Sequence, residues 1–408
     1  MTIPGASTAI DDDGAQAKVL ALVYDVVRRY PPSSTSARDF LRARYDAGLA
    51  WVWFPEGFGG LGLAPSLQTI ADRAMAAAGG YNTTVGSVGY MMTASAIITY
   101  GTDAVKHEFL PMIYTHAADW VQLFSEPGSG SDLAGLLTRA MRDGDEWIVN
   151  GQKVWSSGGM KADWGLLLAR TDPDVPKHNG ITAFLIDMHQ PGVEPRPLRN
   201  MVGSGEFSEV FFTDARIPDA YRLGPVNGGW GVGLTILMNE RVNFTADFAG
   251  AGAPRPDGPI QQLLAMVKAN GIEGPYRDHF MRVWVAYEVS RLTNLRSAAA
   301  RTGGTPGPEG SIGKIASTEL TKRVANLAME LLGAHAMILP TRYPVFGEPD
   351  PSRDTDDLRF NFLGSPSNTI MGGTSEIQRN NVAERVLGLP GEPRGDKGVP
   401  WKEIPRNG

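Results

Sequence analysis

The sequence contains no cysteine, and this absence excludes several kinds of chemistry. Without thiols the chain has no disulfide, no thiolate metal ligand and no cysteine nucleophile. A large chain without disulfides suits a reducing compartment, so we expect a cytoplasmic protein. The six histidines have no metal-ligand spacing and no accompanying carboxylate cluster, so the sequence predicts no metal site.

An excess of basic charge and long apolar runs are missing as well. The 408 residues include 38 basic and 44 acidic side chains, a net charge of −6, and the basic ones are spread along the chain. Nucleic acid is therefore not an expected partner. No run reaches the roughly 18 apolar residues of a membrane span, and Asp11–Asp13 stand where a signal peptide would be basic or apolar. We therefore expect neither a membrane span nor a signal peptide.

The apolar pattern changes twice along the chain and predicts three domains. Residues 1–118 are predicted to be helical, 119–225 to be all-β with Asp-Gly and Asn-Gly turn signals, and 226–408 to be helical again. The helical patterns occupy Ala17–Tyr30, Ser66–Ala78, Met91–Tyr100, Val232–Phe248, Tyr276–Ala300 and Ile312–Leu332.

Two glycine motifs look like nucleotide-binding loops, and we reject both. Gly57–Gly62 matches GxGxxG, but Pro55 and Pro65 bracket it and no acid follows about 20 residues later to hold a ribose. A tight turn is the prediction there. Gly310–Lys314 lacks the glycine spacing and the hydroxyl of a phosphate loop.

Two segments of the β region are better candidates for a ligand site. Ser125–Asp132 is rich in glycine and serine, so its amides and hydroxyls can bind an anion, although an Asp-capped turn explains the same composition. Gly151–Ser157 offers the Trp155 indole and hydroxyls to a flat heteroaromatic ring. The alternative for Trp155 is a core tryptophan on a strand.

Glu240 is an acid among apolar residues. On a helix its neighbours are Ile236, Leu237 and Phe244. Burial among them would raise the pKa of its carboxyl toward the range useful to a general base. The adjacent Arg241 leaves open a purely structural ion-pair network.

Taken in order, these segments resemble the acyl-CoA dehydrogenases, over nearly the whole chain. The resemblance implies an α+β multidomain fold with an N-terminal helical domain, a middle β-barrel or sandwich domain and a C-terminal four-helix bundle. It also implies an oxidoreductase of fatty acid and lipid degradation. The segments that carry it are Tyr100–Pro111, Leu123–Asp132, Gly151–Trp155, Gly229–Arg241 and Gly372–Arg379.

The family binds FAD between the β domain and the C-terminal bundle, and a neighbouring subunit contacts part of the nucleotide. The resemblance implies FAD contacts at matching positions, with Glu330 standing where a glutamine is frequent. These positions are Phe124, Ser125, Gly130 and Ser131 along the isoalloxazine and pyrophosphate, Trp155 and Ser157 at the flavin ring, Thr374 and Glu376 at a helix start, and Glu330 and Gly333 in a further segment.

The family's reaction removes a proton beside a thioester carbonyl while a hydride leaves the adjacent carbon for flavin N5, which gives a trans-2-enoyl-CoA. Many members carry the base just before the Gly-Thr of the C-terminal motif, where this chain has Gly372. A branch similar to isovaleryl-type and many actinobacterial members has Glu-Arg on the first long C-terminal helix instead, which implies Glu240 as base and Arg241 as its support. Substrate contacts are implied for Ser131, Asn239, Arg241, Gly372 and Gly373.

The resemblance also implies partners: an acyl-CoA substrate and an electron-transfer flavoprotein as electron acceptor. A homodimer or homotetramer is expected. A heterotetramer stays open, since the Arg-x-Thr-Phe segment that reaches a neighbour's FAD is not recognisable between Thr245 and Leu263. Two other functions stay open, a flavin oxidase or monooxygenase of the same fold and a non-catalytic partner subunit. The sequence leaves the length and branching of the acyl group undetermined.

Overall fold

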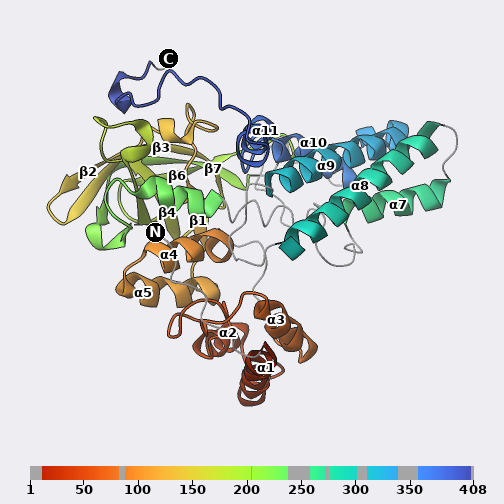
Figure 1. Ribbon diagram of the computed structural model, residues 1–408, viewed down its shortest axis with the longest axis horizontal. Coiled ribbons are helices and arrows are strands. Elements are labelled where there is room, and N and C mark those ends of the chain that lie inside the picture. The colour runs from red at the N-terminus through yellow and green to blue at the C-terminus, as the bar shows by residue number, and fades with distance from the viewer. Residues whose placement is uncertain are drawn as a thin grey trace.

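The structure, a computed structural model, describes residues 12–81, 88–203, 205–237, 258–271, 275–300, 310–338 and 357–405. In Figure 1 the N-terminal helices lie below the β-sheet, and the C-terminal helices extend to one side of it. The helical, β, helical order predicted from the sequence is confirmed.

Two of the N-terminal helices, α2 and α5, begin at a residue whose side chain caps the helix. Ser36 accepts a hydrogen bond from the Asp39 amide, and Thr102 accepts one from the Val105 amide. The first helix ends just before Pro31-Pro32, where proline removes a backbone donor. The helices are α1 (Asp12–Arg29), α2 (Ala37–Asp46), α3 (Leu67–Ala77), α4 (Ala94–Tyr100) and α5 (Asp103–Tyr114).

The glycine motif at Gly57–Gly62 is a tight turn. Gly59 has φ +82°, and its carbonyl accepts hydrogen bonds from the amides of Ala50 and Trp51. A Cβ on Gly59 would lie 2.5 Å from the Tyr45 ring, so the turn requires glycine at this position. The structure at Gly57–Gly62 therefore agrees with the predicted tight turn.

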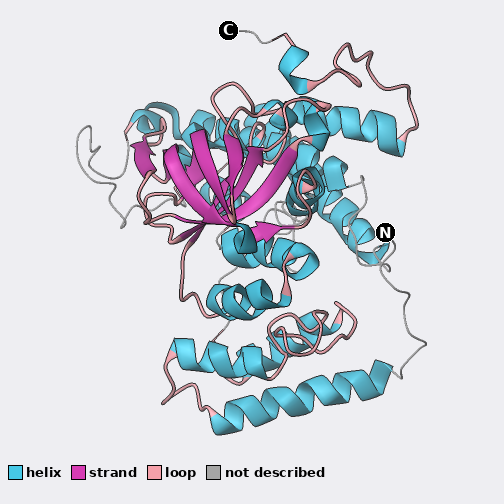
Figure 2. Cartoon of the chain, turned by 90° about the vertical axis from the view of Figure 1, so that its left-hand side faces the viewer, coloured by secondary structure: helices cyan, strands magenta, loops and turns pink. Residues whose placement is uncertain are grey.

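The middle region is an eight-stranded sheet of order β6-β7-β3-β2-β4-β5-β8, with β1 paired to β4. Figure 2 shows the curved sheet with helices around it. The prediction of an all-β middle domain is confirmed. The strands are β1 (Trp120–Leu123), β2 (Arg139–Asp143), β3 (Glu146–Ser157), β4 (Trp164–Arg170), β5 (Ile181–Asp187), β6 (Val193–Leu198), β7 (Phe207–Pro218) and β8 (Arg222–Leu223).

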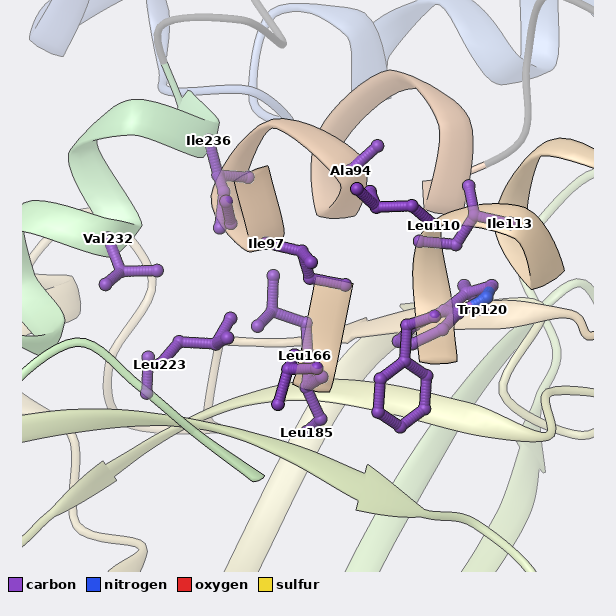
Figure 3. Close-up of a cluster of buried hydrophobic side chains, with 14 of the residues drawn as sticks. Ala94, Ile97, Leu110, Ile113, Trp120, Leu166, Leu185, Leu223, Val232 and Ile236 are labelled. Carbon is purple, nitrogen blue, oxygen red and sulfur yellow. The ribbon is translucent and has the colours of Figure 1, made fainter. Parts of the chain in front are cut away.

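Both faces of this sheet are buried at the central strands β4 and β5. Side chains alternate between the faces of a strand, so Leu166 of β4 belongs to one apolar cluster and Leu167 to another. The cluster in Figure 3 joins Ile97 of α4 and Leu166 to Val232 and Ile236 of the helix 229–237. The first helix of the C-terminal region is therefore anchored against the sheet and the N-terminal helices together.

The described C-terminal helices pack around a separate apolar core. This core includes Leu263, Val283, Val324 and Leu358, one from each of four helices. Gly310–Lys314 forms the first helical turn of α9, so it is no phosphate loop. Among the described residues, no helix is long and apolar enough to cross a membrane. The helices are α7 (Pro259–Asn270), α8 (Pro275–Ala300), α9 (Gly310–Leu332), α10 (Leu358–Asn368) and α11 (Ser375–Asn381).

Beyond α11 the chain returns to the β-sheet. In Figure 1 this last segment, drawn in dark blue, leaves α11 and runs back over the sheet. Pro400 forms a β-bridge with Pro176, which lies between β4 and β5. No sequence pattern predicted this contact.

Candidate active site

The loop that follows β1 is fixed to β3 by a buried ion pair. Lys153 is 0% exposed, and its Nζ lies 2.8 Å from Glu126 Oε1 and donates to the Phe124 carbonyl at 3.0 Å. The amides of Leu137 and Thr138 donate to the same carboxylate at 2.6 and 2.9 Å. The bonded residues come from three stretches of chain, 124–126, 137–138 and Lys153 of β3, so the loop has a defined position.

The environment of Glu126 keeps its carboxyl charged, whereas complete burial lowers the pKa of the Lys153 ammonium despite the nearby carboxylate. Burial by itself would raise the pKa of this carboxyl, but the Lys153 ammonium and the hydrogen bonds from Leu137 and Thr138 outweigh burial and lower the pKa. Breaking such a pair from one side leaves an uncompensated buried charge, which costs about 3–5 kcal/mol. The loop therefore depends on both members.

The other side of the loop is open. Gly130 and Ser131 are exposed, Ser125 is half-buried and the Phe124 side chain is buried. A Cβ built on Gly128 or Gly130 would meet no atom within 4 Å. The amides and hydroxyls predicted to bind an anion thus border free space.

Asp132 does not cap this turn. Its carboxylate accepts two hydrogen bonds from Lys177 Nζ, at 2.7 and 2.9 Å. The short helical turn Leu133–Gly135 that follows has no cap hydrogen bond from the Asp132 side chain. The alternative of an Asp-capped turn is therefore wrong.

Trp155 projects from a bulge in β3. The register of β3 against β7 shifts between Lys153 and Ser156, and Trp155 within the shift has φ +60°. Its side chain is 58% exposed and meets the Phe207 ring edge-on at 5.9 Å. Such a backbone costs a non-glycine residue about 1–3 kcal/mol and is found mainly at functional sites. The core alternative for Trp155 is wrong, and Ser157 beyond it is exposed too.

The loop and the bulge form one group. The Val154 amide donates to the Ser125 carbonyl at 2.9 Å, directly beside the Lys153 anchor. The structure therefore brings Phe124 and Ser125 of the loop beside the bulge that carries Trp155, whereas the FAD contacts of Gly130, Ser131 and Ser157 stay predictions.

A second group lies in the turn between α10 and α11. Gly372 and Gly373 have φ of +66° and +89°, a left-handed backbone that favours glycine. Thr374 caps α11 by accepting from the Ile377 amide at 3.2 Å. The Glu376 side chain is 77% exposed. The turn thus presents Glu376 to solvent while Thr374 is used within the helix cap.

A buried lysine from the rejected glycine motif holds this turn. Lys314 is 0% exposed and donates to the carbonyls of Asn368 at 2.9 Å and Gly373 at 2.8 Å. The side-chain amide of Gln378 donates to the Gly372 carbonyl at 3.1 Å. Sequence reasoning gave Lys314 no role, although a lysine on the buried face of an apolar helix is a signal for one.

Glu330 and Gly333 lie near the opposite end of α9 from Lys314. With a rise of 1.5 Å per residue, Lys314 and Glu330 are about 24 Å apart along the helix. The Glu330 carboxylate faces His279 Nδ1 at 3.3 Å, and Gly333 with φ +53° follows the last residue of the helix. Within one chain, the structure does not bring these residues to the turn at Gly372 and Gly373.

Asn239, Glu240 and Arg241 lie outside the described residues. The helix 229–237 that precedes them is described and has Val232 and Ile236 fully buried. The catalytic and substrate-contact roles of these three residues stay predictions.

Comparison with known proteins gives a consistent result between residues 18 and 387. The acyl-CoA dehydrogenase N-terminal domain matches residues 18–117, the middle domain matches 122–215 and the C-terminal domain matches 227–387. Acyl-CoA dehydrogenase IpdE1 of Mycobacterium tuberculosis is 33% identical over 86% of this chain and 87% of its own length.

Two further relatives extend this comparison. Acyl-CoA dehydrogenase FadE34 of Mycobacterium tuberculosis is 36% identical over 85% of this chain but 45% of its own, so the chain spans about half the length of that protein. Among solved structures, the Tcur3481-Tcur3483 steroid ACAD aligns with a TM-score of 0.70 and 26% identity, covering 93% of this chain and 98% of that one.

The chain belongs to the acyl-CoA dehydrogenase family. It is an oxidoreductase that acts on acyl-CoA, in a family of flavoproteins of lipid metabolism. The predicted family and fold are confirmed.

Proposed function

We propose that this chain binds FAD and uses Glu240 to dehydrogenate an acyl-CoA thioester. The described residues fit a flavin, because the exposed Trp155 indole can lie against a flat ring and the exposed Ser131 and Ser157 offer hydroxyls as hydrogen-bond partners. The strained backbone of Trp155 is maintained by the bulge and keeps the indole out of the core.

Each group of residues has a separate task in this proposal. Phe124, Ser125, Gly130 and Ser131 hold the ring edge and the pyrophosphate, and Trp155 with Ser157 orients the ring. When bound, FAD accepts the hydride that leaves the β-carbon of the acyl group. All remaining steps belong to side chains and amides of the protein.

One observation carries the choice of base. Gly372, with φ +66°, stands immediately before Gly373-Thr374, where many family members have their carboxylate. Glycine cannot remove a proton, so the base must come from elsewhere. Glu240 takes the proton from the α-carbon, and Arg241 beside it supports the carboxylate or the CoA chain.

The remaining substrate contacts follow from this assignment. The amide of Gly372 donates to the thioester oxygen and stabilises the enolate charge that develops as the α-proton leaves. Gly373, Asn239 and Ser131 border the same thioester. The product is a trans-2-enoyl-CoA, with electron-transfer flavoprotein as the proposed acceptor of the electrons.

We propose that a second subunit completes the cofactor site. Glu330 lies about 24 Å along α9 from Lys314, the lysine that binds the Gly373 carbonyl, and Gly333 lies beyond it. Because this is too far from the turn at Gly373 for one site, both residues serve a neighbour's FAD. Helix α8 has an exposed apolar stripe to receive that neighbour, with Val285, Val289 and Leu292 54%, 58% and 55% exposed on one helix face. A homodimer or homotetramer, or a heterotetramer with a related chain, satisfies this geometry.

The test of the base is Glu240→Gln, which removes the proton acceptor and keeps the shape of the side chain. We expect normal FAD content and dehydrogenation reduced by several orders of magnitude. The matched control is Glu56→Gln, which removes a side chain that is 73% exposed in the N-terminal region. Full activity in the Glu240 variant would refute the assignment.

The test of the reaction is an anaerobic visible spectrum during addition of one acyl-CoA at a time. The panel holds medium, long, branched and steroid-ring acyl groups, the last because one structural relative is titled a steroid ACAD. Loss of the flavin band near about 450 nm identifies a substrate. A yellow protein that no thioester bleaches but oxygen reoxidises after chemical reduction favours a flavin oxidase, and a colourless protein favours a non-catalytic partner subunit.

A further inference from the structure

The C-terminal segment 392–405 contacts the loop proposed to hold FAD and acyl-CoA, and the proposed reaction gives it no task. Figure 1 shows this segment passing from α11 over the sheet. It reaches the loop at Asp132–Gly135, whereas the Lys153 anchor holds the other end of the loop at Phe124 and Glu126. Between the two ends, two backbone hydrogen bonds join Glu126 and Ser129, and a Cβ built on Gly128 or Gly130 would meet no atom within 4 Å.

The first contact is ionic. Lys177, 7% exposed, places its Nζ 2.7 Å from Asp132 Oδ1 and 2.5 Å from Asp396 Oδ2. Arg394 adds a contact to Asp396 at 3.3 Å. The hydrogen bonds from Lys177 and then Arg394 hold the pKa of Asp396 well below its usual range, so this bridge is charged at neutral pH.

The second contact is made by Trp401. Its amide donates to the Val175 carbonyl at 2.9 Å and its indole NH to the Gly135 carbonyl at 3.4 Å. The Arg170 guanidinium lies 4.6 Å from the centroid of the Trp401 ring and donates to the Ala134 carbonyl at 2.5 Å. Arg170 is 3% exposed, so Trp401 closes the loop end over a buried cation.

We propose that the segment 392–405 is a strap that positions the Ser125–Ser131 loop for FAD and acyl-CoA, with Asp396 and Trp401 as positioning residues. This inference rests on the proposed function of that loop. A loop fixed at both ends loses less conformational freedom when a ligand orders it, so the strap strengthens binding without taking part in the chemistry. Freeing one loop residue corresponds to about a tenfold loss of affinity.

The experiment compares Asp396→Asn and Trp401→Ala with Lys402→Ala in the full-length holoenzyme. Lys402 belongs to the same segment, but its side chain pairs with the exposed Asp174 at 2.7 Å and does not touch the loop. The measurements are the dissociation constant of FAD, KM and kcat for a thioester that bleaches the wild type, and amide hydrogen exchange of residues 125–135. Asp396→Glu restores the carboxylate and serves as the rescue variant.

We expect the first two variants to weaken FAD binding or raise KM about tenfold, with kcat within about twofold and faster exchange in the loop. The Lys402 variant stays at wild-type values, and Asp396→Glu recovers most of the loss. Variants that match the Lys402 control, or that lower kcat alone, would overturn the strap while leaving the proposed function intact. A wild type that binds no FAD refutes the proposed function and, with it, the role of the strap.

Discussion

Two fully buried lysines hold the two halves of the proposed site, and they do so through different partners. Lys153 of the β-sheet donates to the Phe124 carbonyl and pairs with the Glu126 carboxylate. Lys314 of the helical bundle donates to the main-chain carbonyls of Asn368 and Gly373. The contact made by Lys153, the sheet anchor, therefore depends on a second side chain and its charge. The contact made by Lys314, the bundle anchor, uses main-chain carbonyls, which no substitution can remove.

The difference matters because each lysine fixes a segment proposed to contact ligand. The Phe124 carbonyl begins the loop that leads to Gly130 and Ser131, and the Gly373 carbonyl belongs to the turn proposed to polarise the thioester. Loss of the Lys153–Glu126 pair is expected mainly to destabilise the sheet region, and to affect catalysis only as a consequence. Loss of Lys314 is expected to move the turn while most of the bundle core remains.

The largest effect is expected from Glu126→Gln, which breaks the sheet anchor. The variant leaves the Lys153 ammonium buried without its carboxylate, so the free energy of unfolding should fall by about 3–5 kcal/mol. Chemical denaturation of wild type and variant at pH 7 measures the difference. The double variant Glu126→Gln/Lys153→Met, which removes both charges, should recover part of the loss, and a double variant no more stable than the single one would contradict this explanation.

The same pair predicts a dependence on pH. The folded protein lowers the pKa of Glu126, so the stabilisation is complete above the ordinary carboxyl pKa of about 4.3 and is lost as the pH falls through the lower folded value. The difference in unfolding free energy between wild type and Glu126→Gln should shrink as the pH falls below about pH 4. A difference that grows on acidification would contradict the sign of this shift.

A smaller effect is expected from Lys314→Met, which tests the bundle anchor. The carbonyls of Asn368 and Gly373 lose a donor, and a buried polar group without its partner costs about 1–3 kcal/mol. KM for the acyl-CoA should rise, because the proposed thioester contact at Gly372 is one residue from the displaced carbonyl. Lys322→Met, at a half-exposed position on the same helix, is the control. Equal effects from both would show that Lys314 has no special link to the turn.

The smallest effect on stability is expected from Trp155→Gly. The sign of this effect tests whether the backbone of Trp155 is strained. Glycine accepts φ +60° without strain, so the FAD-free protein should be unchanged or more stable by up to about 1 kcal/mol. FAD affinity should fall, because the indole proposed to lie on the flavin is gone. Thermal melting with and without added FAD separates the two effects. A variant that loses stability without gaining or losing FAD affinity would show that Trp155 serves packing.

The order of domains and most helix positions could be predicted from the sequence. Predicted helices at Tyr276–Ala300 and Ile312–Leu332 correspond to α8 and α9 within about two residues at each end. Helical periodicity and proline stops act over neighbouring residues, so a linear pattern contains the information. The same holds for the turn at Gly57–Gly62, whose proline and glycine signals are local.

The site was predicted in part. The FAD contacts of Phe124, Ser131 and Trp155 follow from a resemblance and stay predictions, and composition alone left Trp155 open between core and surface. A register shift between two strands decided that question, and the register involves Phe207 far along the chain.

The sequence by itself determined the family, the three-part architecture and the absence of a carboxylate at Gly372, because these depend on residue identity and short-range pattern. Tertiary structure alone decided that Lys314 anchors the turn, that Glu330 is remote from it and that Asp396 meets Lys177. These contacts join residues separated by tens to hundreds of positions, and the partner of a buried charge is fixed only when the chain has packed around it.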